Sequence, residues 1–163
     1  MRKKDKDVLA VVDTNLFVSG LINRSGSPAR LVEALRQGAF TLAVSEQLHT
    51  EYKRVFPRPK FTHKFGVTEQ EIAEFLFLIG TNSRRVTPVR RLPLKVRDNK
   101  DAKVLAAALG GKAGYLVTGD DDLLSLRDDP GLGELKIVMV TEFLEILASL
   151  RARNQPQLPP TPA

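Results

Sequence analysis

The chain has 163 residues, of which 42% are hydrophobic and 27% are charged, a composition typical of one globular domain with a substantial core. It contains no cysteine, which excludes a disulfide framework, a zinc–thiolate site and a thiol nucleophile. Lys and Arg number 25 against 19 Asp and Glu, and the resulting net charge of +6 favours a polyanionic partner.

The sequence also bears on membranes and location. No apolar run approaches the length of a membrane span. The first residues, MRKKDKDVLAVV, have a basic opening but no long apolar region with a small-residue cleavage site, so we expect a strand there and not a signal peptide. We therefore expect a cytoplasmic protein without a membrane partner.

Strand-like and helix-like segments alternate along the chain. The unbroken apolar run from Val8 to Val12 predicts a strand buried on both faces, as in a parallel sheet. In the first half of the chain we next expect helices over 16–22 and 28–37, a strand over 39–44, and a helix that is capped by Ser45 and ended by Pro57. A helical turn over 61–65, a helix over 69–79 capped by Thr68 and an edge strand over 84–89 follow. The last part of the chain is expected to form a helix over 100–109, a strand over 115–117, a short helix starting at 123–124, a strand over 136–140 and a helix over 142–150 capped by Thr141. This alternation predicts a three-layer α/β/α sandwich with a central, mostly parallel sheet.

The domain organisation is simple. We expect residues 1–150 to form a single domain, because neither an internal repeat nor a linker interrupts the pattern. Residues 151–163 contain four prolines and few apolar side chains. That composition predicts a disordered tail.

Acidic residues stand at strand ends and at one helix start. Asp13 directly follows the first strand, and 120–122 follow the strand over 115–117. Ligands of open parallel sheets bind at these carboxyl ends. Asp101 opens the helix over 100–109. The alternative for each acid is an ordinary role in helix capping or in the first turn, and for the acids at 120–122 that alternative is capping of the short helix by Asp121 or Asp122.

Glu51 lies within an apolar stripe. Leu48, Tyr52 and Val55 recur at helical spacing, and Glu51 is three residues after the first and four before the last. A lone buried carboxylate would be costly, and a metal ion or an arginine would remove that cost. The alternative is a position at the rim of the stripe, where the side chain reaches solvent.

A gathering of carboxylates needs neutralisation, and a divalent cation is the natural candidate. Ligands that are all oxygen favour Mg²⁺ or Mn²⁺ over zinc. Such a centre suggests phosphodiester hydrolysis by a metal-activated water. The two histidines, His49 and His63, are expected to be surface or structural residues, and no glycine-rich phosphate loop or Ser-His-Asp arrangement occurs.

Positive charge is concentrated in two stretches. Eight basic residues lie between Arg84 and Lys103, and five lie between Lys53 and Lys64 without any acid. The alternative to a nucleic-acid surface is a solvated face that keeps the protein soluble. Next to a carboxylate cluster the first interpretation gains weight, and the expected ligands of an RNA backbone are Arg84, Arg85, Arg90 and Arg91.

Four stretches in this order resemble PIN-domain proteins, in particular the bacterial and archaeal members described as toxins of toxin–antitoxin pairs. They are VVDTNLFVSGL (11–21), VSEQLHTEYKRV (44–55), RDNKDAKVLAAAL (97–109) and YLVTGDDDLL (115–124). The resemblance implies a metal-dependent endoribonuclease that cuts single-stranded RNA with Mg²⁺ or Mn²⁺. It further implies a homodimer and an antitoxin partner.

The resemblance also implies roles for individual residues. The four catalytic, metal-binding acids would be Asp13, Glu51, Asp101 and Asp120, Asp122 would be an auxiliary metal ligand, and Asn15 and Thr118 would support the site through hydrogen bonds. Many relatives carry a denser acidic run where this chain has Asp98-Asn99-Lys100-Asp101-Ala102. This departure leaves the role of Asp98 open.

Two other functions are compatible with the sequence. One is a non-catalytic module that binds RNA or an antitoxin. The other is a phosphatase like the haloacid dehalogenases, which also place an Asp after the first strand. Those enzymes usually have a second Asp two residues later, where this chain has Asn15.

Overall fold

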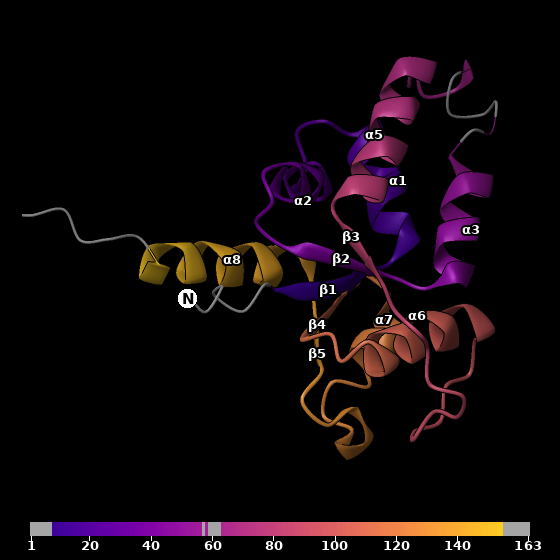
Figure 1. The fold of residues 1–163 in the computed structure, drawn as a ribbon, viewed down its shortest axis with the longest axis vertical. Coiled ribbons are helices and arrows are strands. Elements are labelled where there is room, and N and C mark those ends of the chain that lie inside the picture. Colours follow the sequence, from indigo (N-terminus) through magenta and orange to yellow (C-terminus); the bar gives the residue numbers. More distant parts are fainter. Residues whose placement is uncertain (1–7, 57, 59–62, 155–163) are drawn as a thin grey trace, which may run out of the picture.

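A single parallel sheet forms the centre of the computed structural model, which describes residues 8–56, 58 and 63–154. Its strands are β1 (Leu9–Val12), β2 (Thr41–Val44), β3 (Ser83–Arg85), β4 (Tyr115–Val117) and β5 (Lys136–Val138). They lie in the order β3-β2-β1-β4-β5, and every neighbouring pair is parallel (Figure 1). The carboxyl ends of all five strands therefore meet at one edge of the sheet.

Helices cover both faces of this sheet and give a three-layer α/β/α sandwich (Figure 1). In chain order they are α1 (Thr14–Ile22), α2 (Ser27–Arg36), α3 (Glu46–Val55), α5 (Glu69–Thr81), α6 (Asn99–Gly110), α7 (Asp121–Leu124) and α8 (Val140–Asn154), with a short 3-10 helix at Pro130–Leu132. Helix α6 packs on β1, β4 and β2, and α3 contacts both β2 and α6. The expected fold class is confirmed.

The central strand β1 explains the unbroken apolar run at the start of the chain. All four of its residues are buried, because strands flank it on both sides and helices cover both its faces.

Aromatic rings of three helices pack against one another. The ring of Phe17 on α1 lies 5.7 Å from that of Tyr52 on α3 and 5.1 Å from that of Phe75 on α5, both edge to face. These contacts set the position of α3 relative to β1.

Side-chain caps begin several helices. The Ser45 hydroxyl accepts a hydrogen bond from the Leu48 amide at 3.1 Å, and the Thr68 hydroxyl accepts one from the Glu71 amide at 3.1 Å. Each cap satisfies one of the amides that have no partner in the first turn. The caps predicted at Ser45 and Thr68 are therefore confirmed.

The last helix differs from the prediction. Helix α8 starts at Val140, so Thr141 lies within its first turn and is not the cap. The carboxylate of Glu142 instead accepts a hydrogen bond from the Met139 amide at 2.9 Å, and it also pairs with Arg127. Glu142, the third residue of the helix, thus provides the cap that was expected from Thr141. The helix ends at Asn154, four residues beyond the expected end at Leu150.

Some expectations lie at or beyond the edge of the described chain. Residues 61 and 62 of the helical turn expected over 61–65 lie outside the described residues. The same is true of the expected tail from residue 155 onward. Within residues 8–56, 58 and 63–154, no helix is both long and apolar enough to cross a membrane.

A glycine holds the chain between β3 and α6 against the end of α6. A Cβ atom on Gly110 would lie 2.0 Å from the Thr87 carbonyl oxygen, so no larger residue fits. Nearby, the Val89 amide donates to the Ala106 carbonyl at 3.0 Å. This close approach fixes the start of the basic segment that follows β3.

Candidate metal centre

Asp13 lies at the carboxyl end of the central strand and is only 6% exposed. Its carboxylate accepts hydrogen bonds from the Thr118 hydroxyl at 3.0 Å and from the backbone N–H of Asn15 at 3.4 Å. The second bond makes Asp13 the N-cap of α1. The capping interpretation and a place in a functional site are thus both compatible with its geometry.

A chain of hydrogen bonds continues from Asp13 to the acids after β4. The buried Thr118 hydroxyl accepts from the Asp120 amide at 3.0 Å, and the Asp120 carboxylate accepts from the Asp122 amide at 2.8 Å. The residue that caps α7 is therefore Asp120, and the alternative in which Asp121 or Asp122 caps it is wrong. Because β1 and β4 are neighbours in the sheet, the Thr118 hydroxyl can link Asp13 at the end of one strand to Asp120 after the other.

Asp101 joins these acids from the first turn of α6. Carboxylate oxygens of Asp101, Asp120 and Asp122 lie within 4.8 Å of one another. Asp101 is 4% exposed, and burial raises its pKa to about 6, with further contributions from Asp120, Asp98 and Asp13. The raised pKa of Asp101 thus reflects its burial first and the like charges gathered around it second.

Asp98 lies near this group of acids but has a different role, which is to cap helix α6. Its side chain caps α6 by accepting a hydrogen bond from the Lys100 amide at 2.9 Å. The side chain is exposed, and its charge contributes to the raised pKa of Asp101. Asp98, whose role the sequence left open, is therefore the N-cap of α6.

Glu51 reaches the same region from α3. Its side chain is half-buried, whereas Leu48 and Tyr52 on the same stripe are fully buried, so Glu51 lies at the rim. The Thr14 hydroxyl donates to its carboxylate at 2.9 Å. Since Thr14 is the residue after Asp13, this bond ties Glu51 to the end of β1.

Two buried residues of this region were not among the predicted site residues. The Thr14 hydroxyl donates to the Glu51 carboxylate. Tyr52 was assigned only to the apolar stripe, yet its hydroxyl donates to the Val12 carbonyl at 3.1 Å. Burial, Glu51 and Asp13 all raise the pKa of Tyr52, which therefore stays a neutral donor. The available signal was a hydroxyl in an otherwise apolar stripe.

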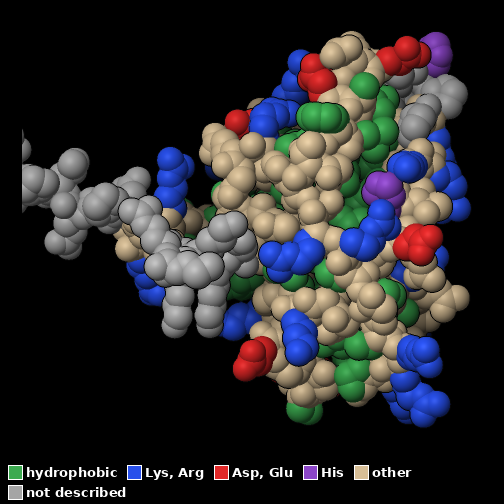
Figure 2. Space-filling view, in the orientation of Figure 1, with side chains coloured by type: hydrophobic (Ala, Val, Ile, Leu, Met, Phe, Trp, Pro, Cys, Tyr) green, Lys and Arg blue, Asp and Glu red, His purple; other side chains and the backbone are tan. Residues whose placement is uncertain are grey.

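The predicted basic residues lie on the outside. Arg84 and Arg85 are exposed on β3, and Arg90 and Arg91 are exposed in the segment that follows. Figure 2 shows Lys and Arg side chains spread over this face. Arg85 lies 3.5 Å from the His49 ring nitrogen. The pKa of His49 is lowered by burial and by the neighbouring cations Arg85 and Lys53.

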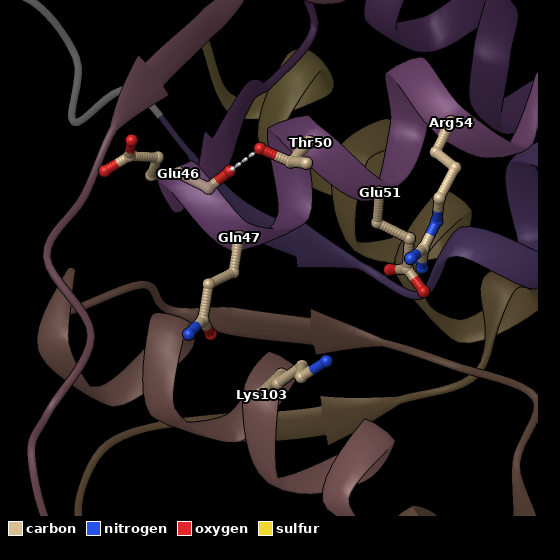
Figure 3. Close-up of a pocket in the computed structure, with 6 residues that line it drawn as sticks. All are labelled: Glu46, Gln47, Thr50, Glu51, Arg54 and Lys103. Atoms are coloured by element: carbon tan, nitrogen blue, oxygen red, sulfur yellow. Dashed lines mark hydrogen bonds between the residues drawn. The ribbon is translucent and has the colours of Figure 1, made fainter.

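A hollow between α3 and α6 adjoins Glu51. Its volume is about 380 Å³. Figure 3 shows the side chains that line it, which are Glu46, Gln47, Thr50, Glu51, Arg54 and Lys103. Arg54 and Lys103 were counted in the basic stretches but were not singled out as site residues.

The comparison with known families bears on all these residues. Residues 9–122 match the family model described as PIN domain. The chain belongs to the PIN-domain family. The matched region contains every acid described above, from Asp13 to Asp122. PIN domains are in general metal-dependent nucleases, and this one has an acidic cluster at the carboxyl edge of its sheet.

One relative of this PIN domain comes from Methanocaldococcus jannaschii. It is 31% identical over 151 residues, which cover 89% of this chain and 96% of the relative. The relative is described only as "Uncharacterized protein MJ1680". It supports a fold shared over nearly the whole chain and leaves the activity to be argued from the site.

Proposed function

We propose that this PIN domain is an endoribonuclease that hydrolyses phosphodiester bonds of single-stranded RNA and depends on Mg²⁺ or Mn²⁺. The observation that carries the proposal is the meeting of carboxylates from distant parts of the chain. Asp101, Asp120 and Asp122 approach within 4.8 Å of one another, and Asp13 joins them through Thr118.

The donor set fits a hard divalent cation. Asp13, Glu51, Asp101, Asp120 and Asp122 offer only oxygen atoms, which Mg²⁺ and Mn²⁺ prefer. A cation at this position would also offset the repulsion that, together with burial, raises the pKa of Asp101. When bound, the metal supplies a water of lowered pKa as nucleophile and neutralises charge on the phosphate.

The chain's own side chains keep these acids oriented. The Thr118 hydroxyl and the backbone N–H of Asn15 each donate to the Asp13 carboxylate. The Thr14 hydroxyl donates to the Glu51 carboxylate. Such supporting hydrogen bonds hold ligand carboxylates in place before a metal arrives.

The substrate backbone would be held by cations outside the acidic centre. Arg84, Arg85, Arg90 and Arg91 are exposed and lie on β3 or in the segment that leads from it to α6. Guanidinium groups suit phosphate oxygens because they can donate two parallel hydrogen bonds. Replacing each of these four residues singly by Ala and measuring RNA affinity would give its separate contribution to RNA binding.

The alternatives are less well supported. A module that only binds RNA gains nothing from carboxylates that repel phosphate, and Asp13 and Asp101 are buried at a cost. A haloacid-dehalogenase-like phosphatase would need a second Asp where this chain has the exposed Asn15. The family match is also to PIN domains.

We further propose that the protein is the toxin of a type II toxin–antitoxin pair, acting in the cytoplasm as a homodimer with an antitoxin partner. The support is the resemblance of its four motif stretches to such toxins. Expression of the protein alone should then arrest growth, and co-expression of the product of an adjacent small gene should restore it. Unimpaired growth on expression of the active enzyme would contradict the toxin role.

The test of the nuclease is the substitution Asp13→Asn, which removes one charge and hardly changes the shape. We expect cleavage of a labelled single-stranded RNA to slow by about 100-fold or more, since even supporting residues of metal sites contribute 10- to 100-fold. The matched control is Asp128→Asn, at an exposed acid outside the site. Wild-type activity should disappear in EDTA and return with Mg²⁺ or Mn²⁺. Full activity of Asp13→Asn, purified free of contaminating nuclease, would remove the proposal.

A further inference from the structure

The hollow between α3 and α6, defined above by its six lining residues, borders the metal centre without being part of it. Glu51 is the only proposed metal ligand among its lining residues, whereas Asp101, Asp120 and Asp122 lie elsewhere. A group bound in the hollow would therefore lie beside Glu51 and outside the acidic cluster. Its volume of about 380 Å³ falls in the range of small-ligand pockets.

Two helices each contribute one cation to this hollow. Arg54 follows Glu51 by three residues on α3, so both side chains share one helix face. Lys103 follows Asp101 by only two residues on α6, which turns it away from the cluster. Asp101 is accordingly buried and Lys103 exposed. In Figure 3, Arg54 points toward Glu51, and Lys103 extends from α6 toward the same space.

These two cations remain available for an anion. Among the residues that the structure describes, neither Arg54 nor Lys103 has an ion-pair partner within 4.0 Å. The acids in the lining are Glu46, which extends to the other end of the hollow (Figure 3), and Glu51, whose carboxylate accepts from Thr14. With a divalent cation at Glu51, positive charge would predominate at the end occupied by Arg54 and Lys103.

We propose that the α3–α6 hollow is a subsite for a backbone phosphate of single-stranded RNA adjacent to the phosphate that is cut, with Arg54 and Lys103 as its ligands. The inference rests on the proposed function for the identity of the cut phosphate. Arg54 supplies a planar fork for phosphate oxygens, and Lys103 supplies a point charge from the facing helix.

The neutral lining residues fit the same occupant. The Thr50 hydroxyl donates to the Glu46 carbonyl at 3.0 Å, as drawn in Figure 3, and is thus already engaged. The amide of Gln47 offers both a donor and an acceptor, which suits a ribose or a base edge. A phosphodiester chain can place one phosphate here and the next at the metal centre. Anchoring both would hold the scissile bond in register.

The experiment compares the double variant Arg54→Ala/Lys103→Ala with the control Arg30→Ala/Lys136→Ala, which removes two exposed cations elsewhere. Binding of a fluorescent single-stranded RNA is measured by anisotropy at several salt concentrations, with Ca²⁺ in place of Mg²⁺ and the RNA checked on a gel for intactness. We expect roughly tenfold weaker binding and a fall of about 0.7 in the slope of log K against log salt, the value for one lost phosphate contact on a single strand.

A second measurement locates the phosphate. Uncharged methylphosphonate linkages are placed singly at positions flanking the scissile bond. One such replacement should lower kcat/KM of the wild type about tenfold and have no further effect in the double variant, because both changes remove the same contact. The control variant should respond like the wild type.

The outcomes separate this inference from the proposed function. Affinity and salt slope of the double variant equal to those of the control would overturn the subsite, whether or not RNA is cut. Equal loss of binding to poly-glutamate and to RNA would also overturn it, since the hollow would then serve any acidic chain. If the double variant loses RNA binding as expected but the wild type cuts nothing with Mg²⁺ or Mn²⁺, the subsite stands and the nuclease proposal fails.

Discussion

Replacing Asp101 by Asn should stabilise the metal-free protein while weakening its metal binding. Asp101 is 4% exposed, and burial together with the Asp120 carboxylate raises its pKa from 3.8 to about 6. Asn has nearly the same shape, carries no charge and can donate a hydrogen bond to Asp120. The substitution thus removes the form of the side chain that the folded state disfavours.

The magnitude follows from the pKa difference. Two units correspond to roughly 3 kcal/mol. Because the pKa is higher in the folded state, that state binds more protons between about pH 4 and 6 and loses stability as the pH rises through this window. The Asn variant avoids this loss, so its advantage should be full near pH 8 and about half as large near pH 5. At pH 8 the Tm should rise by roughly 6 to 12 °C.

The assay is thermal unfolding followed by circular dichroism in EDTA at both pH values. The control is Asp128→Asn, whose Tm should stay within about 2 °C of the wild type, as expected for an exposed site. Adding Mg²⁺ or Mn²⁺ at pH 8 should raise the Tm of the wild type by mass action and that of the Asn variant much less. The reasoning fails if Asp101→Asn is no more stable than the wild type at pH 8, or if its gain is the same at both pH values.

Three further substitutions test the supports of the site. Thr14→Val removes the hydroxyl that donates to Glu51, and kcat/KM for RNA should fall about tenfold with little change in urea stability; an unchanged kcat/KM would contradict the orienting role. Tyr52→Phe leaves the Val12 carbonyl without its side-chain donor and should cost about 1 to 2 kcal/mol in urea unfolding; a variant as stable as the wild type would show that this bond contributes nothing. Gly110→Ala forces a Cβ atom against the Thr87 carbonyl oxygen. This substitution should lower the free energy of unfolding by about 1 to 3 kcal/mol or more. An unchanged Tm would mean that the backbone at Thr87 moves aside without cost.

Much of the fold could be predicted from local patterns. The apolar run Val8–Val12 became the central strand, and Ser45 and Thr68 cap the helices expected of them. These features depend on periodicity and on hydrogen bonds within a few residues. The cap of the last helix was harder to predict, because both Thr141 and Glu142 could provide it. In the structure the Glu142 carboxylate accepts the hydrogen bond from the Met139 amide.

The sequence by itself placed Asp101 at a helix start and Glu51 in an apolar stripe, and it determined which acids follow buried strands, namely Asp13 and Asp120. It did so because buried parallel strands leave a recognisable apolar run that ends where the chain turns. Only the tertiary structure decided which hydrogen bonds orient these acids. The Thr118–Asp13 bond joins residues 105 apart in sequence, and the Thr14–Glu51 bond joins residues 37 apart. Such pairs depend on β4 lying beside β1 and on α3 packing over the strand end, which are properties of the whole sheet and not of any short stretch.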